Sequence, residues 1–310
     1  MMFNVSHLGL YFGISHVEQA KRQAQRLPYK AAWNTLHEAT AANDLAIIQL
    51  NGLRYRFDND RRAGEGAVSL IENPVGLNQD AVYWDSLAET IVTAQCYEML
   101  RDHPAFSALK QTQWRDWFLE RVTHFNQKPF EMTQAESLWL GLLNVAAGIV
   151  LEDEAIFESG AAVYRQTIDE SVRPEGYIAK AVETHDGQSL MNQVLSAQAL
   201  VLMAEAAQHA GVDLWSYSQR GVSVLTATTY PLYYYFYPEK WPWETGLDLE
   251  YAAGLFRQHG GFLEILNRRY DRPLRAIRLI LKDIRPVNDL YGGGLTTLTH
   301  GVAERRGLFG

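Results

Sequence analysis

The sequence predicts an all-α fold, a single domain of helical hairpins arranged as a ring. Apolar residues recur at three- and four-residue spacing from residue 80 to residue 227. The helices come in pairs, each a segment rich in Ala, Gly and Ser, a short polar turn and a second helix. This pattern repeats at roughly fifty residues, as in a ring of helical hairpins. No Gly-, Ser- or Pro-rich linker divides the chain, so residues 1–310 are expected to form one domain.

The first predicted pair of helices covers residues 86–100 and 113–125. Leu87 and Ile91 fall on one side of the first helix, at the spacing of an apolar face. Pro104 follows the first helix, which cannot continue through it. The remaining predicted helices cover residues 137–151, 156–168, 190–209, 218–229, 249–270 and 273–284.

Two segments lack this helical pattern. Residues 50–71 alternate between polar and apolar side chains enough to predict a short strand or an extended arm. Residues 230–245 are dense in Tyr, Trp and Pro, which predicts a loop.

The composition narrows the function classes. A net charge of -8 argues against a nucleic-acid partner, because phosphate binding needs a basic surface. No stretch approaches the roughly 20 apolar residues of a membrane span, and the N-terminus lacks the features of a signal peptide. We therefore expect a cytoplasmic protein, although a mature secreted form would look similar. Cys96, the only cysteine, is expected to be buried and inert. Neither a P-loop nor metal-binding histidine spacing occurs, so no cofactor and no metal site is expected.

Three stretches stand out by their residue pattern. Residues 135–150 read Ala-Glu-Ser-Leu-Trp-Leu-Gly and continue as an apolar helix. Residues 190–207 end in Leu-Met-Ala-Glu-Ala-Ala and precede Gly-Val-Asp-Leu-Trp at 211–215. Residues 285–294 read Arg-Pro-Val-Asn-Asp-Leu-Tyr-Gly-Gly-Gly. Together these stretches resemble the alginate lyase superfamily, and the turn at 211–215 is the most specific of the matches.

The resemblance, strongest over residues 80–298, implies an α/α toroid, an incomplete ring of roughly six helical hairpins. It also implies cleavage of uronate polysaccharides by β-elimination. That chemistry needs a group that neutralises the uronate carboxylate, a base that removes the adjacent proton and an acid for the leaving oxygen.

Members of the superfamily supply these groups from an Asn-His pair, an Arg and a Tyr. In this sequence the Asn-His pair falls on Ala135 and Glu136, the Arg near Gln188 and the Tyr on Asn192. All four positions differ from the family pattern, so a non-standard active site is expected. A shift in register would instead bring His185 or Tyr177 into these roles.

The candidate catalytic residues are therefore Glu136, His185 and Asn192. Glu136 opens an apolar helix and could act as a general acid or base, or it could form a capping box with Thr133. His185 precedes Asp186 in a loop, which is equally typical of a solvated turn. Asn192 could contact a sugar or join an internal hydrogen-bond network.

Aromatic faces pack well against sugar rings, so several Trp residues are candidates for substrate binding. For any one Trp core packing is the stronger expectation, except for the loop pair Trp241 and Trp243, which prolines hold outside a helix. The candidate substrate-binding residues are Gln134, Trp84, Asp85, Trp139, Gln188, Gln193, Trp241 and Trp243.

Three functions remain open. The first is a polysaccharide lyase-like protein with a rebuilt active site, acting on an acidic poly- or oligosaccharide. The second is a non-catalytic carbohydrate-binding or inactive relative. The third is a glycoside hydrolase that pairs Glu136 with another carboxylate, such as Asp85 or Glu183, on the same toroid. The aromatic loop 230–243 is either a wall of the cleft or a candidate oligomer interface.

Overall fold

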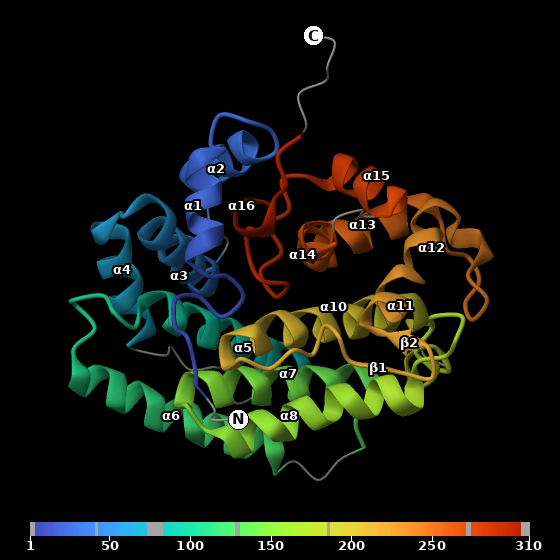
Figure 1. Ribbon diagram of the computed structural model, residues 1–310, viewed down its shortest axis with the longest axis horizontal. Helices are drawn as coiled ribbons and strands as arrows, with labels where there is room; N and C mark the ends of the chain where they lie inside the picture. The colour runs from blue at the N-terminus through green and yellow to red at the C-terminus, as the bar shows by residue number, and fades with distance from the viewer. Residues whose placement is uncertain are drawn as a thin grey trace.

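The computed structural model of the protein describes residues 4–40, 43–72, 83–127, 131–184, 187–270 and 274–304 (Figure 1). Most of these residues are helical, which confirms the all-α prediction. The α-helices are α1 (Ile14–Arg22), α2 (Tyr29–Glu38), α3 (Asp44–Leu53), α4 (Arg61–Ile71), α5 (Tyr83–Leu100), α6 (Ala108–Asn126), α7 (Gln134–Leu151), α8 (Glu154–Gln166), α9 (Ala179–Val182), α10 (Ser189–Ala207), α11 (Val224–Thr229), α12 (Leu232–Phe236), α13 (Leu249–His259), α14 (Gly261–Arg269), α15 (Arg275–Ile284) and α16 (Thr296–His300). Two short strands, β1 (Ser218–Gln219) and β2 (Val222–Ser223), pair antiparallel.

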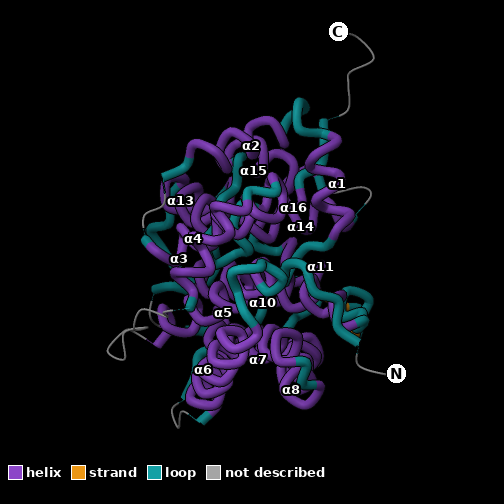
Figure 2. The backbone as a smooth tube through the Cα atoms, turned by 90° about the vertical axis from the view of Figure 1, so that its left-hand side faces the viewer, coloured by secondary structure: helices purple, strands orange, loops and turns teal. Residues whose placement is uncertain are grey.

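Helix α7 contacts α5, α6, α8 and α10 and so lies in the middle of one layer of the fold (Figures 1 and 2). The ring of Trp84, at the start of α5, lies 5.0 Å from that of Trp139, in the second turn of α7. The indole Nε1 of Trp139 donates to the carbonyl of Leu195, in the second turn of α10. At the other end, Arg101 pairs with Glu152 at 3.2 Å, just beyond α5 and α7. The helices α5, α7 and α10 therefore run parallel, and their N-terminal ends share one face.

The hairpin of α7 and α8 is packed backbone against backbone. A Cβ atom on Gly160 of α8 would lie 2.4 Å from the carbonyl oxygen of Gly141 and 2.7 Å from the amide nitrogen of Val145. A Cβ atom on Gly148 would lie 2.5 Å from the amide nitrogen of Phe157. Only glycine fits at these positions, so the small residues of α7 do allow the close approach that the sequence predicted.

The two ends of the described chain meet around α16. This helix contacts α14, α1 and α2. The hydroxyl of Tyr29, at the start of α2, donates to the carbonyl of Gly301, directly after α16. Beside it, the buried carboxylate of Glu264 accepts two hydrogen bonds from Arg285, both 2.7 Å long, and one from the Thr297 hydroxyl at 2.8 Å. A buried carboxylate with three donors joins α14 to the segment that leads into α16.

Four expectations about secondary structure were wrong, and one of them is the single helix over 249–270, which Gly260 divides into α13 and α14. Residues 50–71 are helical, not extended: α3 continues into a π-helical turn, Arg54–Asp58, and Asn59 in the left-handed region separates this turn from α4. Residues 230–245 contain α12 and a 3₁₀ turn, Pro238–Lys240. The helix expected over 218–229 begins only at Val224, after the β-hairpin.

The longest apolar helices lie in the core. By length and composition alone, Gln134–Leu151 and Ser189–Ala210 could cross a membrane, contrary to the expectation that no stretch approaches a membrane span. Yet 72% and 89% of their apolar windows are buried inside the fold, as expected for the core helices of this domain. Cys96 is completely buried on α5, as predicted, and burial raises the pKa of its thiol.

Substituting Gly160 tests whether the close approach of α7 and α8 stabilises the fold. Gly160→Ala should lower the free energy of unfolding by about 1–3 kcal/mol, because the added methyl group meets backbone atoms that cannot move aside. Gly66→Ala is the matched control. A Cβ atom on Gly66 meets nothing within 4 Å, and this residue is exposed on α4, so the control should stabilise by about 0.5–1 kcal/mol through helix propensity. Chemical denaturation measures both variants, and equal effects would contradict the backbone contact.

Candidate functional site

The face where α5, α7 and α10 begin brings together most of the residues that the sequence singled out. Trp84 is half-buried and stacks against Trp139, which is only 1% exposed. Trp139 is therefore a core residue that supports Trp84. Of this pair only Trp84 is partly exposed, and Asp85 beside it is exposed.

Glu136 forms a capping box with Thr133, the alternative to a catalytic role that the sequence predicts. Its Oε2 atom accepts from the amide nitrogen of Thr133 at 2.8 Å and from the Thr133 hydroxyl at 2.9 Å. The Thr133 hydroxyl in turn accepts from the amide nitrogen of Glu136. Both bonds to the carboxylate go to the same oxygen, so the capping role and a role for Oε1 are compatible.

Asn192 is a buried amide with an unpartnered donor. Its side chain is 8% exposed, and its Nδ2 atom makes no hydrogen bond within the described residues. The Ser196 hydroxyl, one turn further along α10, is likewise buried and unpartnered there. Buried polar groups without partners are uncommon in native proteins and call for an explanation such as a ligand or ordered water.

Asn192 and Glu136 lie at the same level of neighbouring helices. Trp139 is bonded to Leu195, and each candidate precedes one of these two residues by three positions, nearly one helical turn. Because α7 and α10 are parallel, the same step brings both candidates to the common N-terminal face.

Two other predicted residues, Gln193 and Gln134, make hydrogen bonds within the protein. The Gln193 amide is fully buried, accepts from the amide nitrogen of Ile178 at 2.9 Å and donates to the carbonyl of Ala227 at 3.1 Å. The side-chain amide of Gln134, the first residue of α7, donates to the Thr167 hydroxyl at 3.3 Å. Gln188 is the exposed residue before α10. His185 lies outside the described residues.

The loop tryptophans have separate environments. Trp241 is 3% exposed, and its indole donates to the Ser189 hydroxyl at 2.7 Å, so it packs in the core beneath the start of α10. Trp243 is half-buried, with its ring 4.9 Å from that of Trp241 and 4.8 Å from that of Tyr177. Ser189 also donates to Glu244, at 3.1 Å. Trp243 and Tyr177 are thus partly exposed, and Tyr233 and Tyr237 form a second, more exposed ring pair in this segment.

Sequence reasoning missed an acidic group beside Trp84. Burial and the charge of Asp85 raise the pKa of Glu89, although Arg121 opposes this shift. Burial and the charges of Glu89 and Asp85 raise the pKa of Tyr291. Tyr291 lies in the glycine-rich segment after Arg285, 202 positions from Glu89. Its place in the third family-like stretch was the signal that could have found it.

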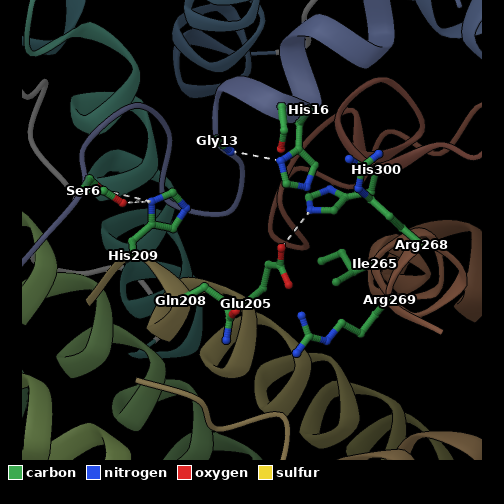
Figure 3. Close-up of a pocket in the computed structure, with 11 residues that line it drawn as sticks. Ser6, Gly13, His16, Glu205, Gln208, His209, Ile265, Arg268, Arg269 and His300 are labelled. Carbon is green, nitrogen blue, oxygen red and sulfur yellow. Dashed lines mark hydrogen bonds and ion pairs between the residues drawn. The ribbon is translucent and has the colours of Figure 1, made fainter. Parts of the chain in front are cut away.

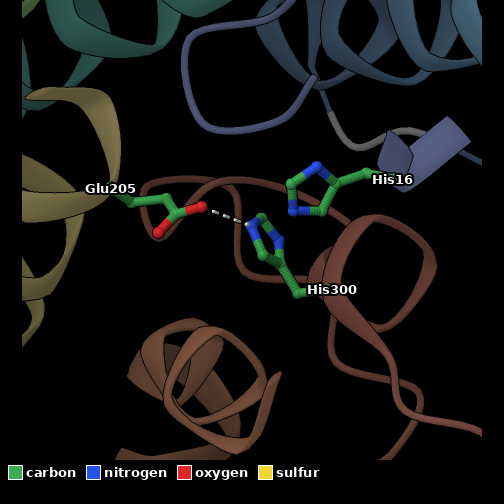
Figure 4. A group of neighbouring side chains, drawn as sticks. All are labelled: His16, Glu205 and His300. Atoms are coloured by element: carbon green, nitrogen blue, oxygen red, sulfur yellow. Dashed lines mark hydrogen bonds and ion pairs between the residues drawn. The ribbon is translucent and has the colours of Figure 1, made fainter. Parts of the chain in front are cut away.

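A separate pocket lies at the opposite end of α10, with a volume of about 450 Å³ (Figure 3). His16, Glu205 and His300 converge in it, with one potential ligand atom of each within 4.8 Å of the others (Figure 4). The lining residues are Ser6, Gly13, Ser15, His16, Glu205, Gln208, His209, Ile265, Arg268, Arg269 and His300. None of the predicted site residues lines this pocket. Its histidines are almost three hundred positions apart, so no spacing motif could reveal them.

The sequence and the fold are similar to those of known proteins. The sequence profile described as Alginate lyase matches residues 16–241. The fold is similar to that of alginate lyase A1-III from Sphingomonas species A1, at 17% identity and a TM-score of 0.70, with 88% of this chain and 78% of that chain covered. It is similar to a histidine-to-alanine variant of A1-III complexed with a tetrasaccharide, at 17% identity and a TM-score of 0.72, with 85% and 76% covered. It is also similar to an alginate lyase from Bacteroides ovatus, at 12% identity and a TM-score of 0.68, with 95% and 99% covered. No curated protein sequence matches the chain. These structures share the toroid fold, and the family profile spans most of the sequence: the chain belongs to the alginate lyase family.

Proposed function

We propose that this protein is a polysaccharide lyase that cleaves a uronate-containing glycan by β-elimination, at the face where α5, α7 and α10 begin. The observation that carries this proposal is the unpartnered, buried amide donor of Asn192, at the level of the Glu136 carboxylate, in a fold of the alginate lyase family.

The helix N-termini at this face favour an anionic group on the ligand. The N-terminal end of a helix carries a partial positive charge, and three parallel helices begin here. These helix ends contribute positive potential to a face that also carries the carboxylates of Asp85, Glu89 and Glu136. Oligosaccharide binding by a relative, the A1-III variant complexed with a tetrasaccharide, agrees with a glycan as the ligand.

Each step of the elimination has a candidate group. The Asn192 amide would donate to the uronate carboxylate and stabilise the negative charge that develops on it. Glu136 Oε1 would take the proton from the carbon that bears the carboxylate. The electron pair left on that carbon forms the new double bond as the neighbouring carbon–oxygen bond breaks. Tyr291, whose raised pKa keeps its hydroxyl protonated, is the candidate proton donor to the leaving oxygen.

Ala135 favours a second candidate, a non-catalytic uronate-binding protein. Its methyl group is 3% exposed and occupies the position where the family resemblance expects an amide. If this substitution abolished catalysis, the same face would bind the glycan without cleaving it.

A substrate panel distinguishes the two. The purified chain is incubated with alginate, glucuronan and other uronate polymers, and the ultraviolet absorbance of the unsaturated product is followed. We expect turnover of at least one polymer. Silence across the panel together with measurable binding in calorimetry would favour the binding protein, and silence with no binding would refute both.

Replacing the proposed base isolates proton transfer. Glu136→Gln keeps an oxygen that can accept the Thr133 bonds but cannot take up a proton. We expect kcat to fall by about 100-fold to 10,000-fold, the usual contribution of general base catalysis, with an unchanged melting temperature. Glu154→Gln, which removes the first-turn carboxylate of α8 far from this face, is the control and should keep full activity. Retained activity in Glu136→Gln would exclude Glu136 as the base.

Two neighbours on α10 separate substrate binding from structural support. Asn192→Ala removes an amide donor that has no internal partner, so kcat/KM should fall by about 100-fold or more without a loss of thermal stability. Gln193→Ala removes an amide with two internal bonds and should lower the melting temperature. A melting temperature that falls equally in both variants would show that Asn192 is structural.

A further inference from the structure

The pocket at the C-terminal end of α10 is remote from the proposed active site. Glu205 and Asn192 are thirteen residues apart on the same helix, which corresponds to about 20 Å along its axis. The chemistry of this pocket can therefore be argued independently of any reaction at the other end.

Glu205 is already engaged by the protein. One carboxylate oxygen, Oε1, lies 3.4 Å from Nε2 of His300, and the other, Oε2, accepts from the Trp215 indole at 3.2 Å. Burial opposes ionisation of Glu205, but the hydrogen bond and charge of His300, together with the charges of His209 and Arg269, hold its pKa below the ordinary value. The pocket thus contains one carboxylate, and both of its oxygens have partners.

His16 presents a hydrogen-bond donor to the pocket. The amide nitrogen of Gly13 donates to His16 Nδ1 at 3.1 Å, as part of the cap at the start of α1. An accepting Nδ1 carries no proton, so in the neutral ring Nε2 carries it. Nε2 is the atom that faces His300 and Glu205 (Figure 4), and it makes no hydrogen bond within the described ranges.

This tautomer argues against a metal ion, despite the convergence of His16, Glu205 and His300. A metal bound to His16 Nε2 needs the lone pair there, which would place the ring proton on Nδ1, against the amide hydrogen of Gly13. Two arginines, Arg268 and Arg269, also line the pocket and would repel a cation.

The same two arginines provide donors that the protein leaves unused. Arg268 Nη1 is buried and has no hydrogen-bond partner within the described residues. The Arg269 guanidinium lies 5.4 Å from the Trp215 ring centroid, and its ion pair with the exposed Asp213 is long, at 4.0 Å. Figure 3 shows Arg268 beside the two histidine rings and Arg269 extending toward Glu205.

We propose that this pocket binds a small oxyanion-bearing ligand, whose carboxylate or phosphate group is held by His16 Nε2, Arg268 and Arg269. Two guanidinium groups against one engaged carboxylate leave a net positive charge, and guanidinium forks match the geometry of oxyanions. A volume of about 450 Å³ admits a body of the size of a single sugar acid.

Calorimetry on the full chain tests this proposal with glucuronate, inorganic phosphate, glucose and Zn²⁺ as separate probes. Glucuronate, phosphate or both should bind, more weakly as salt is added, and the comparison of the two identifies the source of the oxyanion. Glucose should not bind. Arg268→Gln and Arg269→Gln should each weaken anion binding about tenfold or more, whereas Arg257→Gln, an exposed arginine on α13, should have no effect.

The outcomes separate clearly. Failure of both anions to bind would overturn the proposal, as would anion binding that neither pocket variant weakens. Stoichiometric Zn²⁺ binding that His16→Ala abolishes would replace it with a metal site. Should Arg268→Gln fail to fold, the more exposed Arg269→Gln still decides the question.

Discussion

The fold depends on how closely α7 and α8 approach each other. Gly148 and Gly160 bring the two backbones into direct contact, because a Cβ atom at either position would clash with backbone atoms of the other helix. Helix α8 covers one side of α7, and the other sides of α7 pack on α5 and α10. That arrangement makes α7 the central member of a parallel set of helices and brings their N-terminal ends to one face. The geometry of the candidate site therefore follows from the packing of the α7–α8 hairpin.

Much of this architecture could be predicted from the sequence, because the long helices repeat their apolar residues regularly and carry small residues where they touch. The exceptions have physical causes. Residues 50–71 mimic strand alternation because a π-helical turn shifts the apolar face part of the way along the segment. Residues 249–270 read as one helix, yet the chain turns at Gly260, where a Cβ atom would lie 2.2 Å from the carbonyl oxygen of Phe256.

The candidate site was predictable in position and less so in composition. Glu136 and Asn192 could be predicted because they are polar residues on apolar helices, a pattern that a single sequence is enough to show. Gln193 gives the same signal for the opposite reason, since its amide satisfies the buried backbone groups around it. Only the three-dimensional structure distinguishes a polar atom that has an internal hydrogen-bond partner from one that has none. Only the structure likewise shows that Tyr291 lies near Glu89.

The seam at Tyr29 and Gly301 has a consequence for how the protein folds. These residues are 272 positions apart, so their contact closes nearly the whole chain into a loop. The α7–α8 hairpin, in contrast, closes over a turn of a few residues. Loop-closure entropy grows with separation along the chain, and non-local contacts slow folding. We expect the hairpins to assemble first and the seam to form last, which makes it the first part of the ring to open when the protein fluctuates.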